Sequence, residues 1–597
     1  MLGKIAEDNA VKKMKFCNSP ASHSVTVSHS VTEKVPAQSF ALTRWISMKI
    51  RFSWFAQCYA FASVFLGTGS LLLAQSPMMI ATGWDSPTPS RFHSELAAFE
   101  ALNVFDGTTI SPTRTLSNGR TVPCRNAFVD EPWQWDDFQA ELADLLAATP
   151  STATENFVFL YANPGDVDWF DDAAWENVTE HWRLLARLAK QGNLRGILFD
   201  AEPYHPPHSQ FRYTAQPNAG EYSFEEFVAQ SRKRGQQVMR AVTEEYPDIT
   251  IMSYRLFCDM IPTVQTGDLE QSIQTHTYGL LPGFLDGWLD VAPDTISICE
   301  GDEDAYRFNS EAEFNHAYTS IKLQAPRYLS PENQAIFRQI FTVGHGLYLD
   351  AHVNPPESSW YIDRDGSTSA GRLRANASAA LAASDGYVWL YGERARWWPG
   401  GKQTDPTWEE KMPGAIQALR LARDPVGVAT ERLGSIERDA NLLANGDMKN
   451  GAVEGLPAQW WAWQEETSHG KFAHQPSQAT ANGVLSGVLG QTLDVQPGEC
   501  YLASTQVRSS GNGFACLTIG WKSAEGKWLH RSPHQRFGPT VDNGPGGSHP
   551  SDWATAVGWI QVPEDAGQLV FMLSVSGQLS EQDEAAFRDC LLVKQPN

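Results

Sequence analysis

Cysteine is scarce and scattered in this chain of 597 residues, which contains only eight. Two precede residue 75, and the other six are Cys124, Cys258, Cys299, Cys500, Cys516 and Cys590. None of them forms a CxxC pair or another zinc-type spacing, which argues against a cysteine-ligated metal. Export would permit disulfides, but the spacing selects no pairing.

Positive charge is also in short supply. The chain has 46 Lys and Arg against 69 Asp and Glu, so its formal net charge is -23. Such an acidic chain argues against a nucleic-acid partner and against an anionic membrane surface. The sequence is richer in tryptophan, with 21 residues. Flat aromatic faces stack on sugar rings, although tryptophan is equally a core residue.

A long uninterrupted apolar run is missing as well. Residues 48–51 begin a basic stretch, and the mostly apolar residues 52–74 are interrupted by Gln57 and by 67–70. This pattern predicts a signal peptide over 48–74, cleaved after Ala74, and disfavours a membrane helix. Residues 1–47 are polar and unpatterned, which predicts a disordered leader or an upstream start, with Met48 as the true start. We therefore expect a secreted or periplasmic protein without membrane insertion after signal removal.

Eight apolar runs occur between residues 78 and 393, and amphipathic stretches separate most of them. One such stretch places Trp175, Val178, Trp182, Leu185 and Leu188 on one helical face before Gly192. Two S-x-x-E capping boxes, 223–226 and 310–313, indicate helix starts. Eight strand–helix units over about 350 residues predict an α/β fold, a (β/α)8 or TIM barrel, over 75–425. The alternative is a doubly wound sheet, but no G-x-G-x-x-G loop follows the first strand.

The pattern changes near residue 441. Helical periodicity stops, and short alternating runs appear between Gly, Pro and Asn turns. This predicts an all-β sandwich over 441–597, joined to the barrel by a linker over 426–440. We find no internal repeat.

The stretch Arg195–Tyr204 combines a buried-strand pattern with acids at its end. Residues two apart on a strand point to the same side, so Asp200 and Glu202 are predicted to enter one pocket. Active sites of such barrels gather at the carboxyl ends of the strands. The competing interpretation is a helix cap followed by a surface acid.

The other strand ends supply further candidates. The candidate catalytic acids are Glu202, Asp200, Glu300 and Glu393. The candidate substrate-binding residues are Trp84, Asp85, Tyr204, Tyr254, His276, Tyr278, His345, Asp350 and Trp389. Any one of these side chains is equally compatible with packing or with a solvated loop.

Ala201-Glu202-Pro203 resembles the Asn-Glu-Pro of the large retaining glycosidase clan built on this barrel. That resemblance implies that Glu202 is the acid/base and that the nucleophile ends the seventh strand, nearest Asp350. The chain departs from the clan because Ala201 replaces the Asn and no Glu ends the seventh strand. Asp200-Ala201-Glu202 also resembles the tail of the D-x-x-D-x-D-x-E strand of chitinase-like barrels, which implies that Asp200 supports attack by the substrate's own acetamido group.

Both resemblances make Glu202 the proton donor, and an ionised Asp200 beside it is expected to raise its pKa. A second carboxylate stabilises the oxocarbenium-like transition state, about 5–5.5 Å away in retaining enzymes and roughly 6.5–9.5 Å away in inverting ones. Asp200 and Glu202 are too close in sequence to flank a bond. We expect the partner to be Glu300, and Glu393 is the second choice.

The ends of the late region, 441–448 and 587–593, resemble jelly-roll carbohydrate-binding modules of secreted glycosidases. The resemblance implies a structural calcium near Asp447 and Asp589. A sugar platform is expected from the tryptophans of this region, which are Trp460, Trp461, Trp463, Trp521 and Trp528. A stabilising sandwich that binds nothing is the alternative.

These observations predict a secreted glycoside hydrolase that cleaves a poly- or oligosaccharide by carboxylate acid/base catalysis. No cofactor is expected apart from the structural calcium. A non-catalytic polysaccharide-binding protein is the first alternative. The second is a metal-dependent hydrolase that uses His276, His345 and Asp350.

Overall fold

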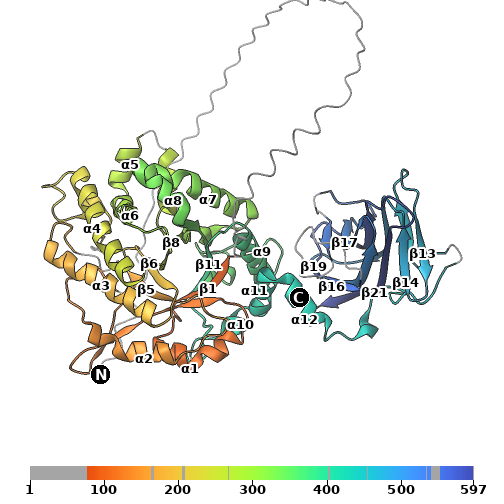
Figure 1. Ribbon diagram of the computed structural model, residues 1–597, viewed down its shortest axis with the longest axis horizontal. Coiled ribbons are helices and arrows are strands. Elements are labelled where there is room, and N and C mark those ends of the chain that lie inside the picture. Colours follow the sequence, from red (N-terminus) through yellow and green to blue (C-terminus); the bar gives the residue numbers. More distant parts are fainter. Residues whose placement is uncertain are drawn as a thin grey trace, which may run out of the picture. The chain divides into compact units, whose positions relative to one another are not determined.

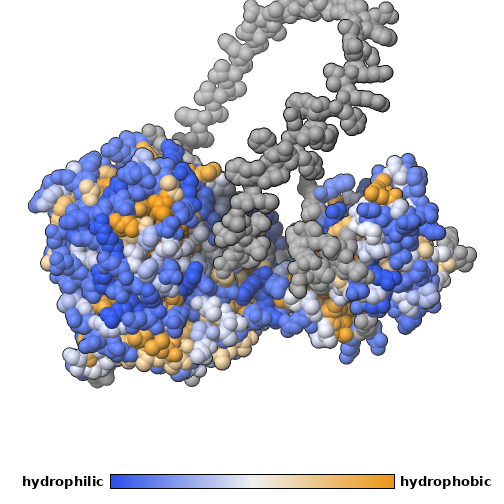
Figure 2. Space-filling view, in the orientation of Figure 1, coloured by the Kyte–Doolittle hydropathy of each residue, from blue (hydrophilic) through white to orange (hydrophobic). Residues whose placement is uncertain are grey.

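The computed structural model describes residues 77–595 apart from 125, 163–166, 205–208, 266–267, 401–403, 453–454, 531, 533 and 539–551. The expected leader, the signal peptide and the third-strand end Asn163 lie outside the described residues. In the described part, hydrophilic residues cover most of the face seen in Figure 2, as the acidic composition leads one to expect.

The first part of the chain forms a nearly closed parallel sheet of nine strands (Figure 1). The strands are β1 (Met78–Gly83), β2 (Gly107–Ile110), β5 (Phe157–Tyr161), β6 (Gly196–Asp200), β7 (Thr250–Ser253), β8 (Ser297–Glu300), β9 (Phe341–Val343), β10 (His345–Tyr348) and β11 (Tyr387–Gly392). They are ordered β10-β11-β1-β2-β5-β6-β7-β8-β9. A small antiparallel pair, β3 (Thr113–Thr115) and β4 (Thr121–Pro123), follows β2.

The two edges of this sheet, β9 and β10, are joined by Gly344 alone. Its N–H donates to Glu300 O of β8 at 2.7 Å. A Cβ at this position would lie 1.8 Å from Tyr387 O, so only glycine fits so close to β11. The single seventh strand expected over 340–350 is thus divided into two strands, and the sheet is nearly closed.

Helices surround the parallel strands (Figure 1). They are α1 (Pro89–Glu100), α2 (Gln139–Ala147), α3 (Asp172–Gln191), α4 (Phe224–Glu245), α5 (Leu269–Thr275), α6 (Leu281–Leu289), α7 (Glu311–Gln324), α8 (Gln334–Ile340), α9 (Ser369–Ala382), α10 (Trp408–Lys411) and α11 (Ala415–Arg423). The expected apolar face of α3 is buried throughout, and that helix ends at Gly192. No described helix has both the length and the apolar character that a membrane crossing requires.

One of the two expected capping boxes is present. Ser223 and Glu226 exchange hydrogen bonds at the start of α4. At α7, the Ser310 side chain does not cap a backbone N–H, so the box expected there is wrong. The Glu313 carboxylate instead accepts from the Ser310 hydroxyl at 2.7 Å and from Asn309 N at 2.9 Å.

Side chains fill the interior of the parallel sheet. Strand residues such as Ile80, Leu198 and Met252 form a buried cluster with Tyr254 and Trp389. A separate and larger cluster lies between the strands and the helices. Because the interior is packed, a ligand has access only above the ends of the strands.

The last part of the chain consists of two five-stranded antiparallel sheets. One has the order β12 (Trp461–Gln464), β15 (Ser486–Asp494), β20 (Gln568–Ser576), β17 (Phe514–Lys522), β18 (Gln535–Phe537). The other has the order β13 (Lys471–Gln475), β14 (Gln478–Asn482), β21 (Glu584–Gln595), β16 (Cys500–Ser510), β19 (Ala554–Gln561). The segment expected to link this part to the barrel contains α12 (Pro425–Leu433) and a short 3-10 turn, Arg438–Ala440. The six described cysteines are buried and free.

Candidate functional site

Asp200 ends β6, and the chain beyond it folds back onto its carboxylate. The side chain is fully buried. Its Oδ1 accepts the backbone N–H of Glu202 at 2.9 Å, and its Oδ2 accepts the Tyr204 hydroxyl. Burial raises the pKa of Asp200 to about 7, and the negative charge of Glu202 adds to that rise. The expected influence, an ionised Asp200 acting on Glu202, is thus reversed, because Asp200 is the buried member of the pair. The structure therefore brings these three predicted residues together, with Asp200 enclosed and Glu202 partly exposed.

A third carboxylate, Glu303, belongs to the same group of charges. It begins the short 3-10 helix Glu303–Arg307, just beyond β8. Arg255, which follows β7, donates to Glu303 Oε2 from Nη2 at 2.8 Å and from Nε at 3.0 Å. Burial raises the pKa of Glu303 to about 8; Arg255 opposes the rise, whereas Glu202 and Asp200 add to it. We call Asp200, Glu202 and Glu303 the acid cluster.

Glu303 was not predicted from the sequence, which favoured Glu300 instead. Glu300 is fully buried, and its carboxylate accepts backbone N–H groups from Phe257 at 2.6 Å and Asp302 at 3.1 Å. Leu256 N lies 3.0 and 3.1 Å from the two oxygens. Burial raises the pKa of Glu300 to about 7. The Glu300 side chain thus connects the turn after β7 to the turn after β8 by hydrogen bonds to their backbone.

Glu393 and Asp350 form a second pair of acids. Glu393 N donates to Asp350 Oδ2 at 2.8 Å, and Arg394 Nε lies 3.7 Å from Asp350 Oδ1. Burial raises the pKa of both carboxyl groups, and the Asp350 charge adds to the rise at Glu393. The structure thus brings these two predicted residues together beyond β10 and β11.

Aromatic rings form the top layer of the barrel interior beneath these acids. Tyr254 stacks on Trp389 with ring centroids 4.1 Å apart, and the Trp389 indole donates to Gly301 O at 2.7 Å. Tyr306 packs on Trp389 at 5.2 Å. Tyr254 and Trp389 are thus buried packing residues below the acids.

Three aromatic side chains at the same end of the barrel remain open to solvent. Trp84 is 69% exposed and donates from Nε1 to the Tyr391 hydroxyl at 3.1 Å. Tyr204 and Trp360 are also exposed, and the Arg307 guanidinium lies 4.0 Å from the Trp360 ring centroid. Trp360 was not predicted, because it lies on a loop between β10 and α9 rather than at a strand end.

The other predicted substrate-binding residues have partners within the protein. Asp85 Oδ2 accepts the backbone N–H groups of Trp397 at 2.9 Å and Trp398 at 2.8 Å, so it binds the loop after β11. His345 is buried and its Nδ1 lies 2.7 Å from Asp302 Oδ2.

His276 and Tyr278 lie on the segment after α5. His276 Nδ1 accepts Tyr278 N at 3.1 Å, and the Arg255 guanidinium lies 5.5 Å from the Tyr278 ring centroid. Among the described residues, no three His, Cys, Asp or Glu side chains form a metal-binding group. His276, His345 and Asp350 are therefore not assembled as such a group.

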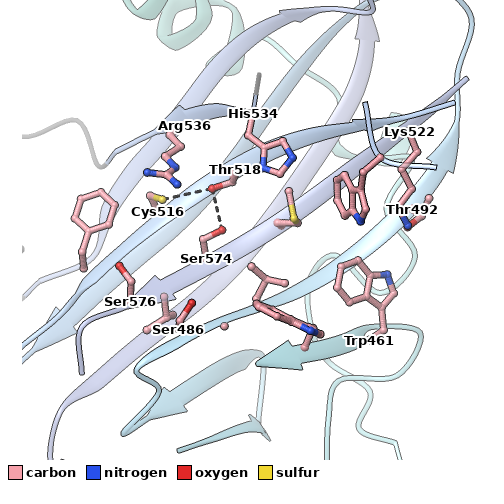
Figure 3. Close-up of a pocket in the computed structure, with 17 residues that line it drawn as sticks. Trp461, Ser486, Thr492, Cys516, Thr518, Lys522, His534, Arg536, Ser574 and Ser576 are labelled. Atoms are coloured by element: carbon pink, nitrogen blue, oxygen red, sulfur yellow. Dashed lines mark hydrogen bonds between the residues drawn. The ribbon is translucent and has the colours of Figure 1, made fainter. Parts of the chain in front are cut away.

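The sandwich carries an open groove of about 730 Å³ on the sheet that contains β12, β15, β20, β17 and β18 (Figure 3). Trp461, Trp463 and Trp528 line it, as expected of a sugar platform, and Trp463 and Trp528 are 56% and 40% exposed. Trp460 and Trp521, also expected there, are buried in the sandwich core. Trp521 alternates with the groove-lining Lys522, because successive strand residues point to opposite faces.

Two glycines give the groove its flat aromatic surface. A Cβ on Gly490 would lie 2.8 Å from the Trp461 ring, and a Cβ on Gly520 would lie 2.8 Å from the Trp528 ring. Each indole therefore lies against the backbone of a glycine, and hydroxyl groups also line the groove. The hydroxyls of Thr518 and Ser574 are 2.8 Å apart (Figure 3).

The calcium expected between Asp447 and Asp589 does not fit the side chains present. The two ends of the sandwich do meet, since Cys590 N donates to Gly446 O at 2.9 Å. However, Lys449 Nζ lies 2.8 Å from Asp447 Oδ2, and its charge also acts with Asp589. An ammonium group thus already pairs with Asp447, and among the described residues no three His, Cys, Asp or Glu side chains form a metal-binding group, so we assign no role to calcium.

No family model and no curated protein matches the chain. Among solved structures, the enzymatically active domain of bacteriophage CBA120 tailspike protein 4 is 13% identical over 27% of this chain and 22% of that one, with a TM-score of 0.21. A CBM4 domain is 15% identical over 26% of this chain and 99% of its own, with a TM-score of 0.19. TmCBM61 in complex with beta-1,4-galactotriose is 15% identical over 26% and 99%, with a TM-score of 0.18. With TM-scores this low, the function has to be argued from the sites themselves.

Proposed function

We propose that this protein is a secreted glycoside hydrolase. Its catalytic domain, 75–425, is a (β/α)8 barrel whose seventh strand is interrupted at Gly344. A linker, 426–440, leads to a jelly-roll-like carbohydrate-binding module, 441–597. The acid cluster beside Arg255, above a layer of buried aromatic rings, is the observation that carries this proposal.

Protonation is the central chemical requirement. A glycosidic oxygen is a poor leaving group unless it is protonated, so one carboxyl group must keep its proton near neutral pH. The raised pKa values of Asp200 and Glu303 keep protons within the acid cluster in that range. Carboxyl groups close together share protons, because two neighbouring negative charges repel each other.

The surroundings of each acid suggest its role. Glu202 is partly exposed at the mouth and delivers the proton to the leaving oxygen. Asp200 is a positioning residue, because both of its oxygens are bound by Glu202 N and the Tyr204 hydroxyl. Glu303, held by Arg255, replaces Glu300 as the second carboxylate: in the reactive form the proton of the acid cluster sits on Glu202, and Glu303, ionised beside Arg255, stabilises the positive charge that develops on the sugar. Glu393 is the next candidate for the role of the second carboxylate.

Recognition of the sugar falls to the exposed rings of Trp84, Tyr204 and Trp360. Their faces provide apolar area at the mouth of the barrel, and sugar rings stack on such faces. The groove of the sandwich keeps the polymer near the barrel. The partner of this protein is thus a carbohydrate, with no nucleic-acid partner and no membrane insertion after signal removal.

A panel of polysaccharides tests the proposal. The mature wild type is expected to release reducing ends from at least one of them, and the Glu202→Gln variant is expected to lose this activity while still binding the polymer. Glu357→Gln is the matched control, because Glu357 is an exposed acid on the loop before Trp360. Failure of the wild type to cleave any glycan would overturn the proposal.

A polysaccharide-binding protein without hydrolytic activity is the second candidate, and the groove of the sandwich is the observation that favours it. It would bind a glycan equally well before and after Glu202→Gln, and the wild type would release no sugar.

Secretion has its own test. The proposed signal peptide, 48–74, is expected to be removed on export. N-terminal sequencing of the exported protein is then expected to begin at Gln75, and retention of residues 48–74 would contradict the assignment.

A further inference from the structure

The groove of the sandwich has a charge opposite to that of the whole chain. Among the residues that the structure describes, its lining includes two cations, Lys522 and Arg536, and no Asp or Glu. The chain as a whole has a net charge of -23. Burial and the nearby Arg536 lower the pKa of His534, which favours the neutral ring. The groove is thus a positive site on an acidic protein.

The two cations have no acid partner among the residues that the structure describes. The ion pairs of the sandwich engage Lys449, Arg508 and Lys594 instead. Lys522 Nζ lies 4.8 Å from the centroid of the Trp528 ring, and Arg536 is exposed on β18. Both cations are therefore available to a ligand in the groove.

The spacing of the cations suits an extended ligand. Arg536 lies opposite Thr518 in the pairing of β18 with β17, and Lys522 is four residues further along β17. That separation is about 13 Å along a strand. Figure 3 shows that Thr518 and Trp461 line the same groove as the two cations. A chain of sugar rings can therefore reach both cations while stacking on tryptophan.

We infer that the groove binds an anionic glycan, one whose sugars carry carboxylate or sulfate groups. The inference rests on the proposed carbohydrate-binding role of the sandwich and specifies its ligand. The rings of the glycan stack on Trp461, Trp463 and Trp528, and its acidic groups bind Arg536 and Lys522. Arg536 suits this role because a guanidinium donates two parallel hydrogen bonds to a planar or tetrahedral anion.

Binding assays on the full chain test this inference, with Glu202→Gln as the parent so that hydrolysis does not remove the ligand. The probes are polygalacturonate for carboxylate, dextran sulfate for sulfate, a neutral galactan and single-stranded DNA. The parent is expected to bind one of the two acidic glycans, and which one it binds distinguishes carboxylate from sulfate. This binding is expected to weaken with added salt.

Variants of the groove make the test specific. Arg536→Gln and Lys522→Gln are each expected to weaken binding of the acidic glycan about tenfold, the loss typical of one charged hydrogen bond. Trp463→Ala is expected to weaken it as well. Lys471→Gln, an exposed lysine on β13 of the other sheet, is the control and is expected to change nothing.

Three outcomes would overturn the inference. These are binding of the neutral galactan as tight as that of either acidic glycan, binding of DNA of equal strength, and unchanged affinity in both charge variants. Hydrolysis by the wild type is measured separately. If the acidic glycan binds and no glycan is cleaved, the hydrolase proposal fails and the anionic-glycan groove stands.

Discussion

Asp200 is fully buried and the Glu303 side chain is only 14% exposed, and both lie next to further negative charge, a costly arrangement for two carboxyl groups. Burial disfavours the ionised form, which is why their pKa values rise to about 7 and about 8. Residues that lower the stability of the fold in this way are typical of functional sites. At the scale of single residues, replacing an acid of the acid cluster is therefore expected to raise the stability of the fold and to lower activity.

Replacing Asp200 with Asn tests this opposition. The pKa of Asp200 is about 7 in the folded chain against an ordinary 3.8, so the fold prefers the protonated form. Its contribution to stability is present below the unfolded pKa and is lost as pH rises through the folded one. Asp200→Asn cannot ionise and is expected to be more stable than the wild type by on the order of 3 kcal/mol at about pH 9.

Denaturant unfolding of both proteins at about pH 9 and about pH 4 measures the difference. It is expected to shrink towards acidic pH, where the folded state is fully protonated and the unfolded carboxyl group is about half protonated. Equal stability of the two proteins at alkaline pH would contradict the buried, protonated carboxyl group. Hydrolysis is expected to fall in the same variant, because the Asn carbonyl can still accept Glu202 N but the NH2 group cannot accept the Tyr204 hydroxyl, and the acid cluster loses one titratable proton.

Glu300 and Glu303 are three residues apart and provide a second, matched comparison. Glu300→Gln is expected to lower the free energy of unfolding by about 1–3 kcal/mol, because an amide cannot accept all of its backbone N–H groups. Glu303→Gln is expected to leave the fold intact and to reduce kcat by at least a hundredfold. The reverse pattern, with activity lost only in the first variant, would return the role to Glu300.

The sequence identified some of these residues and missed others for a clear reason. Alternation along a strand was enough to place Asp200 and Glu202 at one end of β6. The same attention to strand ends selected Glu300 as the second carboxylate, because Glu300 ends β8. The chain then turns through Asp302, whose φ of 47° is left-handed, and this turn leads into Glu303. Such a turn has no periodicity from which it could be predicted.

At the scale of strands and helices, the same limits apply. The apolar face of α3 and the capping box of α4 were predicted correctly, because helical periodicity and local hydrogen bonding determine them. The division of the expected seventh strand at Gly344 was not predicted. It depends on the close approach of Tyr387 O, a contact between residues far apart in the sequence.

The glycines beneath the groove tryptophans give a prediction at this scale. Gly490→Val would place a side chain where the Trp461 ring now lies, so the indole has to tilt away from the sheet. Glycan binding is expected to weaken about as much as in Trp461→Ala. Because a Cβ would also lie 2.9 Å from Phe571 O, circular dichroism of the variant checks that the sandwich is folded. Calorimetric titration of both variants checks the binding, and unchanged binding by Gly490→Val would remove Trp461 from the binding surface.

At the scale of the whole molecule, the sequence predicted an α/β region followed by an all-β region, and the structure has a nearly closed parallel sheet followed by antiparallel sheets. The composition predicted an acidic protein. It could not predict the positive groove, since Lys522 and Arg536 come together only through the pairing of β17 with β18. We propose a different role for each of these two parts: the barrel catalyses hydrolysis, and the sandwich binds an anionic polymer.

The central claim is that Glu202 protonates the glycosidic oxygen, and its most direct test compares two leaving groups. With the glycan that the wild type cleaves, Glu202→Gln is expected to lose about 10²–10⁴-fold in rate, the usual contribution of general acid catalysis. With a dinitrophenyl glycoside of the same sugar, whose leaving group needs no proton, formation of the phenolate is expected to fall far less. An equal loss with both substrates, or no loss with either, would contradict the assignment of Glu202 as the proton donor.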